Sequence, residues 1–394
     1  MPEDNRQIKN ILITGAGGLL GPLLAARLLS DPQYRVLLTD VVEPAVPRRG
    51  AASSSPSSPS SSPYYPEHAT TVRGDLTSPD FVGALVAHPA AQPRLHAAFL
   101  FHGVMSAAAE ADPALSLRVN FDSVRLLADA LRARHPGVRV IYASSLAVFG
   151  PPFPTTTTNT TTTTTTTAAG AAATTDGGGD NNESGSGSGS NSGDGAVRRV
   201  KVRASAWPPT PQSTYGAHKL MAEVYLNEAH RRGWLDVVIA RLPTVSVRPG
   251  RPTGAASSFL SGMVREPMAG RECVVPLRDR GFRAFLASPA TVVENLVRVL
   301  SWDGRRRAPA LPPHARQVLF PGIAVSIREL RDALARHGGE DKLRLVREVE
   351  DDGLERILRS WAEDFDIDES LRLGLAVDES TDTLVRQYVE SLGA

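Results

Sequence analysis

The chain has 394 residues, with 43 Lys and Arg against 42 Asp and Glu, and its net charge is +1. This balance gives no excess positive field for nucleic acid or an anionic membrane, and no run of about 18 apolar residues is present to span a bilayer. The polar N-terminus carries no signal-peptide pattern, and Cys273, the single cysteine, excludes an intrachain disulfide framework and a cysteine-built zinc site. We therefore expect a cytoplasmic protein that acts on a small molecule, without a metal, nucleic-acid or membrane partner.

Two low-complexity segments interrupt the chain. Residues 50–63 are almost wholly Ser, Pro and Ala, and residues 155–196 are a threonine run followed by Gly, Ser, Asn and Asp. Such compositions bury too little apolar surface to offset the entropy of ordering, so we expect two disordered inserts, looped out over about 45–66 and 151–206. The remaining residues are enough for one large α/β domain with an appended lobe.

The rest of the chain alternates β-branched or apolar runs with helical periodicity. In chain order, the pattern predicts a strand at 8–14, a helix at 18–30, strands at 35–40 and 70–73, a helix at 79–88, a strand at 95–101, a helix at 112–135, a strand at 138–144, a helix at 213–232 and a strand at 237–241. This alternation implies right-handed crossovers and hence a Rossmann-type doubly wound parallel sheet over residues 1–242. From residue 243 the pattern is irregular, with helices near 290–301, 326–337 and 380–391, and it predicts mainly a smaller C-terminal substrate-binding lobe over 243–394.

A glycine-rich turn joins the first strand to the first helix. The residues of this turn that we expect at a cofactor are Gly15, Gly18, Leu19, Leu20 and Gly21. Glycine exposes backbone N–H groups to a pyrophosphate at a helix N-terminus and lets helix and strand approach closely. Asp40 follows Gly21 by 19 residues at the end of the second strand, where a carboxylate accepts hydrogen bonds from ribose hydroxyls. The combination predicts dinucleotide binding rather than an ordinary tight turn.

Acidic residues after the second and third strands bear on which dinucleotide is bound. Asp40 would repel a 2′-phosphate and so predicts NAD over NADP, although Arg48 and Arg49 at the edge of the first insert leave NADP open. Asp75 and Leu76 follow the third strand, where a carboxylate and the backbone can reach the adenine amino group. An N-cap for the helix at 79–88 is the alternative role for Asp75.

Tyr215 and Lys219 are four residues apart on a predicted helix and therefore share one face. A free tyrosine titrates near 10, so service as a base near neutrality needs a pKa lowered by about 3 units, which a nearby ammonium and a positively charged nicotinamide can supply. Ser145 directly follows the strand at 138–144, and Ser144, the second candidate, ends it. A hydroxyl at this end of the strand can hold a substrate oxygen against the phenol. If Ser145 and Tyr215 serve one site, the second insert must bulge outward, at a cost of only about 1 kcal/mol in closure entropy.

The glycine turn, Asp40, Ser145, Tyr215 and Lys219 together resemble the extended short-chain dehydrogenase/reductase superfamily, which holds the NAD-dependent epimerases and dehydratases. The resemblance covers nearly all of the chain outside the two inserts. Residues 241–250, with the sequence RLPTVSVRPG, are similar to the D-erythronate dehydrogenase branch, because other branches usually carry an asparagine where Thr244 stands. The segments 110–112, 117–120, 255–259, 264–267, 378–380 and 385–386 point the same way.

The resemblance implies NAD-dependent oxidation of the 2-hydroxyl of a four-carbon sugar acid, such as D-erythronate, to the 2-oxo acid. It implies that Tyr215 is the general base, that Lys219 lowers the phenol pKa and binds the nicotinamide ribose, and that Ser145 orients the reacting oxygen. Asn120 would shape the site or relay protons, or else be a buried hydrogen-bonding residue, and Gly103 would lie beside the cofactor. A homodimer through the helices at 112–135 and 213–232 is a superfamily expectation.

A sugar acid brings a carboxylate that needs a cationic partner, preferably a guanidinium fork. Arg283 stands where the family places an arginine near the substrate and is our first candidate, and Arg248 is the second. The candidates for the remaining substrate hydroxyls are Ser106, Thr244, Ser257 and Ser258.

Two short segments depart from the family pattern. Residues 106–108 read Ser-Ala-Ala where Ser-Gly-Glu is usual, and residues 101–103 read Phe-His-Gly where small apolar residues are usual. These changes affect the expected substrate and not the cofactor. His102 is either a ligand contact or a histidine packed at the end of a strand.

Other functions stay open at this point. A nucleotide-sugar 4-epimerase with tightly held NAD would need a uridine-diphosphate pocket and usually an asparagine at Thr244. A dehydratase would need acidic residues after Ser145, where Leu146 and Ala147 stand. A non-catalytic NAD-sensing scaffold would have no chemical reason to keep the serine, tyrosine and lysine together.

Overall fold

The computed structural model describes residues 7–48, 63–153, 155–156, 198–199, 201–252, 255–302 and 311–393. Its contacts divide the chain into one unit of residues 1–152 and 202–394 and a second unit of residues 153–201. In the second unit, β6 (Thr155–Thr156) pairs antiparallel with β7 (Arg198–Arg199). Most of both predicted inserts lies outside the described residues.

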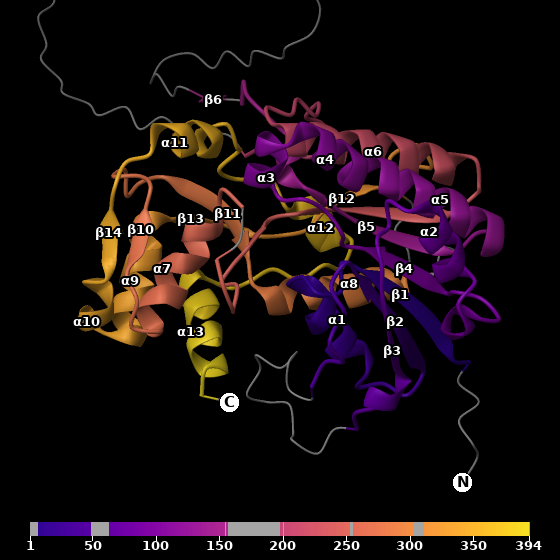
Figure 1. Ribbon diagram of the computed structural model, residues 1–394. Helices are drawn as coiled ribbons and strands as arrows, with labels where there is room; N and C mark the ends of the chain where they lie inside the picture. The colour runs from indigo at the N-terminus through magenta and orange to yellow at the C-terminus, as the bar shows by residue number, and fades with distance from the viewer. Residues whose placement is uncertain are drawn as a thin grey trace, which may run out of the picture. The chain divides into compact units, whose positions relative to one another are not determined.

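The first unit contains a seven-stranded sheet whose strand order is β12-β8-β5-β4-β1-β2-β3 (Figure 1). Every neighbouring pair in it is parallel. The strands are β1 (Lys9–Thr14), β2 (Tyr34–Asp40), β3 (Ala69–Arg73), β4 (Ala97–Leu100), β5 (Arg139–Ser145), β8 (Asp236–Leu242) and β12 (Gln317–Leu319). The order reverses at β1, so a ligand crevice is expected beyond the carboxyl ends of β1 and β4. The predicted Rossmann-type doubly wound sheet is confirmed, and β12 is an addition that the sequence did not reveal.

Helices cover both faces of this sheet (Figure 1). Ile11 and Ile13 of β1 pack into one core with α1 (Leu20–Leu28) and α8 (Pro289–Ser301). Leu12, which points the other way, packs into a second core. The helices of this second face are α2 (Pro79–Val86), α5 (Ser123–Arg134) and α6 (Thr214–Arg231). Burial on both faces explains why the strands read as nearly continuous apolar runs.

The helix predicted at 112–135 is three pieces in the structure. Asp112 caps α4 (Pro113–Leu117), because its Oδ1 accepts a hydrogen bond from the backbone N–H of Leu115 at 2.8 Å. A π-helical turn, η3 (Arg118–Asp122), then precedes α5, and α3 (Ser106–Ala111) lies before α4. Such wide turns are rare and often occur at functional sites. The short 3₁₀ turns are η1 (Pro66–His68), η2 (Pro89–Ala91) and η4 (Leu146–Val148).

The irregular C-terminal part forms a smaller lobe with its own apolar core, which includes Phe259, Leu330 and Val385. Its strands are β9 (Thr244–Val245), β10 (Cys273–Val275), β11 (Arg283–Ala287), β13 (Ile323–Ser326) and β14 (Val346–Glu348). Its helices are α7 (Ser258–Met268), α9 (Ile327–Gly338), α10 (Glu340–Leu343), α11 (Asp352–Arg359) and α13 (Thr381–Ser391), whereas α12 (Asp368–Arg372) lies against β12, where Ser370 donates a hydrogen bond to the carbonyl of Leu319. Because α8 and β12 return to the large sheet, the domain division at residue 242 stays a prediction.

The second insert was expected to be looped out over about 151–206, but the chain belongs to the first unit again from residue 202. Val202 is buried and forms a parallel bridge with Phe365. The ring of Phe365 lies 5.6 Å from that of Phe149, just beyond β5, and 5.1 Å from that of Phe285 in β11. One buried aromatic ring therefore joins the large sheet to the smaller lobe.

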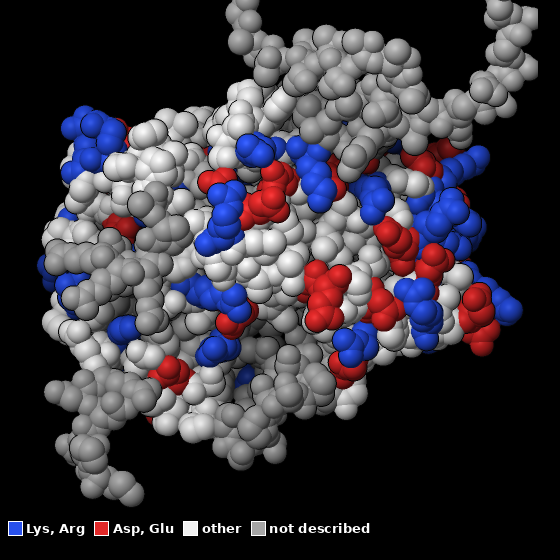
Figure 2. Space-filling model, turned by 180° about the vertical axis from the view of Figure 1, so that it is seen from behind, with Lys and Arg blue, Asp and Glu red and all other residues white. Residues whose placement is uncertain are grey.

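The surface of the described residues carries both signs of charge. On the face in Figure 2, Lys and Arg side chains lie among Asp and Glu side chains. None of the described helices is both long and apolar enough to cross a lipid bilayer. The homodimer expected from the superfamily stays a prediction.

Candidate active site

A cavity of about 720 Å³ opens at the carboxyl ends of the parallel strands. The predicted cofactor residues that line it are Gly15, Gly18, Leu19, Leu20, Asp40, Asp75, Leu76, Gly103, Tyr215 and Lys219. The predicted substrate residues that line it are Ser106, Ser145, Thr244, Arg248, Ser257 and Arg283. Gly21, Asn120 and Ser258 do not belong to the lining formed by the described residues. The structure thus gathers residues from most of the chain at one crevice.

The glycine turn forms a cradle without side chains at the N-terminus of α1. Gly15 has a φ of +64°, and a Cβ there would lie 2.5 Å from the backbone nitrogen of His102. A Cβ on Gly21 would lie 2.6 Å from the Cα of Ala16, so this glycine allows the helix to approach the turn. Leu19 at the N-cap makes no side-chain capping bond, which leaves the first N–H groups of α1 to a ligand. The cradle fits a pyrophosphate.

Two carboxylates border the end of the cavity next to this turn. Asp40 ends β2, and its Oδ2 accepts a hydrogen bond from Gly17 N at 2.9 Å. Asp75 accepts one from Thr77 N at 2.9 Å, whereas the N-cap of α2 is Ser78. The capping alternative for Asp75 is therefore wrong, because a different side chain occupies that position. Both carboxylates therefore line the same cavity as the glycine turn.

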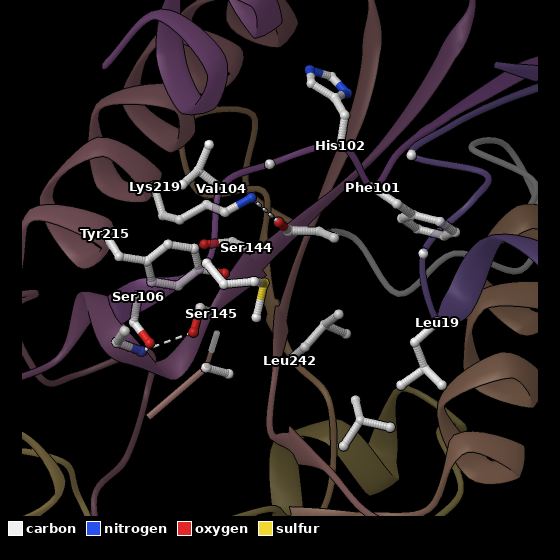
Figure 3. Close-up of a pocket in the computed structure, with 18 of the residues that line it drawn as sticks. Leu19, Phe101, His102, Val104, Ser106, Ser144, Ser145, Tyr215, Lys219 and Leu242 are labelled. Atoms are coloured by element: carbon white, nitrogen blue, oxygen red, sulfur yellow. Dashed lines mark hydrogen bonds between the residues drawn. The ribbon is translucent and has the colours of Figure 1, made fainter. Parts of the chain in front are cut away.

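Tyr215 and Lys219 extend from α6 toward the end of β5 (Figure 3). The Nζ of Lys219 donates a hydrogen bond to the carbonyl of Ala143 at 2.9 Å and lies 5.7 Å from the centre of the Tyr215 ring. The Ser145 hydroxyl faces the same cavity as Tyr215 and acts to lower the pKa of its phenol. Ser144 instead donates to Glu223 at 2.5 Å, so Ser145 is the hydroxyl that the structure brings to the phenol.

Burial dominates the titration of this pair. It raises the pKa of Tyr215 to about 12, against the opposing effects of the Ser145 hydrogen bond and the Arg248 charge. It also lowers the pKa of Lys219 to about 8, against the effect of the Glu223 carboxylate. The expected depression of the phenol pKa by Lys219 is therefore not seen in the protein alone, because the loss of hydration outweighs the nearby positive charges.

Asn120 lies in the π turn η3 and is completely buried. Its Oδ1 accepts from Val104 N at 2.8 Å, and its Nδ2 donates to Val104 O at 3.0 Å and to Ser116 Oγ at 3.0 Å. A Cβ on Gly103 would lie 2.8 Å from Asn120 Oδ1 and 3.5 Å from Lys219 Nζ. Asn120 therefore fixes the backbone beside the lysine, which supports its proposed role in shaping the site.

The two candidate arginines have different surroundings. Arg283 is exposed over 45% of its side chain, and its Nη2 donates to the carbonyl of Ala324 at 2.7 Å and lies 3.5 Å from a carboxylate oxygen of Glu329. Arg248 is half-buried, and its Nε donates to the carbonyl of Val245 at 2.8 Å. The positive charge of Arg248 acts to lower the pKa of Tyr215.

Hydroxyls line the same part of the cavity. Ser257 Oγ lies 3.5 Å from Nη2 of Arg248, and Ser106 Oγ accepts a hydrogen bond from Ala256 N at 3.2 Å. Thr244 begins β9, directly after β8, and also faces the cavity. An apolar wall from the smaller lobe adds Leu358, Trp361 and Ala362, which the sequence patterns did not single out.

His102 is held between three elements. Its Nδ1 lies 2.7 Å from Thr14 Oγ1 at the end of β1, and its Nε2 lies 3.0 Å from Ser123 Oγ at the start of α5. Burial, followed by the charge of Lys219, lowers its pKa to about 3, so the imidazole is neutral near pH 7. Of the two alternatives left open by the sequence, the contacts favour a histidine packed at the end of a strand.

The fold and this site define a dinucleotide-dependent enzyme of the Rossmann type. The model of the NAD dependent epimerase/dehydratase family matches residues 11–172 and 186–288, and the chain belongs to this family. NAD is accordingly its cofactor, in agreement with the glycine turn and Asp40.

Curated relatives extend over nearly the whole chain. The D-erythronate dehydrogenase of Haemophilus influenzae is 29% identical over 384 residues, which cover 96% of this chain and 98% of that protein. The D-erythronate dehydrogenase of Cupriavidus necator is 30% identical over 397 residues, which cover 98% and 99%. The crystal structure of the nucleoside-diphosphate-sugar epimerase from Agrobacterium tumefaciens has a TM-score of 0.74 and 25% identity, and covers 100% of this chain and 98% of its own.

Proposed function

We propose that this chain is an NAD-dependent dehydrogenase that oxidises the 2-hydroxyl of a four-carbon sugar acid, D-erythronate or a close relative, to the 2-oxo acid. The observation that carries the proposal is the meeting of Ser145, Tyr215 and Lys219 at one wall of the cavity that also contains the glycine turn. The choice of substrate class is supported by the two D-erythronate dehydrogenases that match nearly the full chain.

Each polar residue at this wall has a role in the proposed reaction. Ser145 holds the substrate hydroxyl against the phenol of Tyr215, and Tyr215 takes its proton as the general base. Lys219, anchored on the carbonyl of Ala143, keeps its ammonium group beside the phenol ring and would hold the cofactor ribose through its remaining hydrogens. The chemistry that bound NAD would supply is acceptance of a hydride from the carbon that carries this hydroxyl.

The raised pKa of Tyr215 constrains how the base is formed. With a pKa of about 12, the phenol is protonated at neutral pH in the protein alone. The phenolate therefore needs more positive charge in the cavity than Lys219 and Arg248 supply there, and an oxidised nicotinamide ring brings such a charge. This requirement favours proton transfer only after the cofactor has been bound.

We propose Arg248, rather than Arg283, as the main partner of the substrate carboxylate. This ranking is the reverse of the one expected from the sequence. In a 2-hydroxy acid the carboxylate is one bond from the reacting carbon, so its partner must lie near Tyr215. Arg248 acts on the Tyr215 phenol electrostatically, whereas Arg283 is exposed and already donates to Ala324. Ser106, Thr244 and Ser257 are left for the distal hydroxyls.

The test is to mix the purified protein with NAD and a panel of aldonic acids of three to six carbons, and to follow NADH absorbance. We expect reduction of NAD with a four-carbon acid and its loss by a factor of about 10² to 10⁴ in Tyr215→Phe, with NAD binding retained. Turnover of a uridine-diphosphate sugar without reduction by any acid would instead favour an epimerase, as in the Agrobacterium tumefaciens structure. NAD binding with neither activity would favour a non-catalytic sensor.

A further inference from the structure

Helix α6 carries three polar residues at intervals of four, Tyr215, Lys219 and Glu223, and they therefore lie along one face. Each contacts one of three consecutive residues at the end of β5. The pairs are Tyr215 with Ser145, Lys219 with Ala143 and Glu223 with Ser144. The proposed reaction uses the first two pairs and gives the third no role.

Glu223 is a completely buried carboxylate behind the wall of the cavity. Ser144 Oγ donates to its Oε1 at 2.5 Å. Arg241 of β8 donates to both oxygens, from Nη2 to Oε2 at 2.7 Å and from Nε to Oε1 at 3.0 Å. Gln317 of β12 adds a contact of 3.4 Å. A buried ion pair often stabilises a fold no better than apolar side chains of equal size, so stability is a weak reason for this arrangement.

We propose that Glu223 is a positioning residue of the active site, which holds Ser144 at the end of β5 and stabilises the ammonium form of Lys219 from the side away from the cavity. One helical turn separates the two side chains, so about 5 to 6 Å lies between their Cβ atoms. The inference rests on the proposed function in so far as Lys219 must be charged to favour the Tyr215 phenolate.

The charges around Lys219 fix the direction of the effect. Burial lowers the pKa of Lys219 to about 8, and the Glu223 carboxylate opposes this shift. The other ionisable groups around this pair are Tyr215, Tyr142 with its ring 4.8 Å from the ammonium, His102 and, beyond Glu223, Arg241. None of these supplies a negative charge at neutral pH, because the phenols are protonated and the imidazole is neutral. Loss of the Glu223 charge therefore lowers the lysine pKa further.

The chain is well suited to a direct measurement, because its four lysines are Lys9, Lys201, Lys219 and Lys342. Lysine labelled with ¹³C at the ε carbon gives four signals, and Lys219→Arg assigns the one of interest. We expect that signal to titrate near pH 8 in the parent protein. In Glu223→Gln, which keeps an acceptor for Ser144, we expect the midpoint to fall by about one pH unit or more. An unchanged midpoint would overturn the proposal.

Two variants separate charge from hydrogen bonding and from general effects on the helix. Glu228→Gln makes the same substitution five positions further along α6, at an exposed carboxylate paired with Arg231 and Arg232. It is expected to leave the Lys219 midpoint in place. Ser144→Ala removes the bond to Glu223 but keeps the charge, so it too should leave the midpoint in place. A midpoint that moves with Ser144→Ala and not with Glu223→Gln would contradict the charge effect.

A paired variant keeps the experiment decisive if Glu223→Gln does not fold, since that change leaves the buried Arg241 without its carboxylate. E223Q/R241M removes both charges, and the Lys219 midpoint is again expected to fall, but by less than in Glu223→Gln, because loss of the Arg241 charge partly offsets loss of the carboxylate. The titration needs neither NAD nor substrate, so it can succeed even if no sugar acid is oxidised. In an active enzyme, the alkaline limb of kcat/KM should move to lower pH together with the lysine signal.

Discussion

Arg248 owes its fixed position to backbone and side-chain contacts on several sides. Its Nε donates to the carbonyl of Val245, and its own backbone N–H donates to Ser261 Oγ at 3.1 Å. Its carbonyl accepts from Arg265 Nη1 at 3.1 Å. A guanidinium held in this way loses little further side-chain entropy when it binds a carboxylate.

The first prediction compares Arg248→Met with Arg283→Met. Loss of a charge-assisted bond at Arg248 should raise KM for the sugar acid by about 10- to 100-fold, because such a bond contributes about 1.5 to 3 kcal/mol. Arg283→Met should have a several-fold smaller effect, because its guanidinium is exposed. Steady-state kinetics with the acid, with NAD binding as the control, distinguish the two. A larger loss for Arg283→Met would restore the order expected from the sequence.

At the scale of single residues, the sequence identified most of the residues that line the cavity beside the glycine turn, because a dinucleotide site requires glycine, acid, tyrosine or lysine for chemical reasons. It did not identify Glu223 and Arg241 as a buried pair. Glu223 looks like any charged residue on a helix until β5 and β8 are known to be neighbours. The choice between Ser144 and Ser145 likewise needed the position of Glu223.

Between strand β1 and helix α1, the turn geometry leaves no room for a side chain. Gly15→Ala should destabilise the fold by about 1 to 2 kcal/mol from the left-handed backbone alone, and more from the contact with His102. Gly83→Ala in α2 is the matched control, because nothing lies within 4 Å of its added Cβ. It should stabilise the fold by about 0.5 to 1 kcal/mol. Urea unfolding of both variants tests this, and equal effects would contradict it.

His102 links β1 to α5, and this link makes the fold sensitive to acid. Its pKa is about 3 in the folded protein against 6.5 as a model value, so the unfolded chain takes up a proton first as the pH falls. Stability from this group is complete above about pH 6.5 and is lost toward pH 3, by at most about 1.4 kcal/mol for each pH unit. Unfolding of His102→Gln between pH 4 and 7 should show a flatter pH dependence. A parallel curve would show that other groups dominate.

Helices and strands could be predicted from the sequence where a long run of residues shows a regular apolar spacing. The helices at 213–232 and 326–337 correspond to α6 and α9 within two residues. The helix at 112–135 was predicted as continuous, because the apolar spacing runs through it. The π turn η3 contains the buried Asn120, and the spacing gives no sign of this turn. Strand β12 is only three residues long and carries too weak a pattern to be recognised.

For the whole molecule, the two ends of the segment between Gly150 and Thr210 are held together by a hydrogen bond, which Thr210 Oγ1 donates to the carbonyl of Gly150 at 2.9 Å. Replacing residues 157–197 by a short Gly/Ser linker should therefore leave kcat/KM within about twofold of the parent. The shorter loop should stabilise the fold by about 1 to 2 kcal/mol. Thermal unfolding and NADH formation measure both, and an inactive but folded variant would contradict the expectation.

Phe365 also has a consequence for how the substrate is admitted. Its ring contacts Phe149 next to β5 and Phe285 in β11, so the two lobes cannot swing apart without exposing a fully buried aromatic side chain. Burying such a ring contributes about 2 to 3 kcal/mol, which opposes hinge motion. We therefore expect the enzyme to distinguish between sugar acids by the shape of a rigid cavity and not by domain closure. Small-angle scattering profiles of the free and the substrate-saturated enzyme should then be similar.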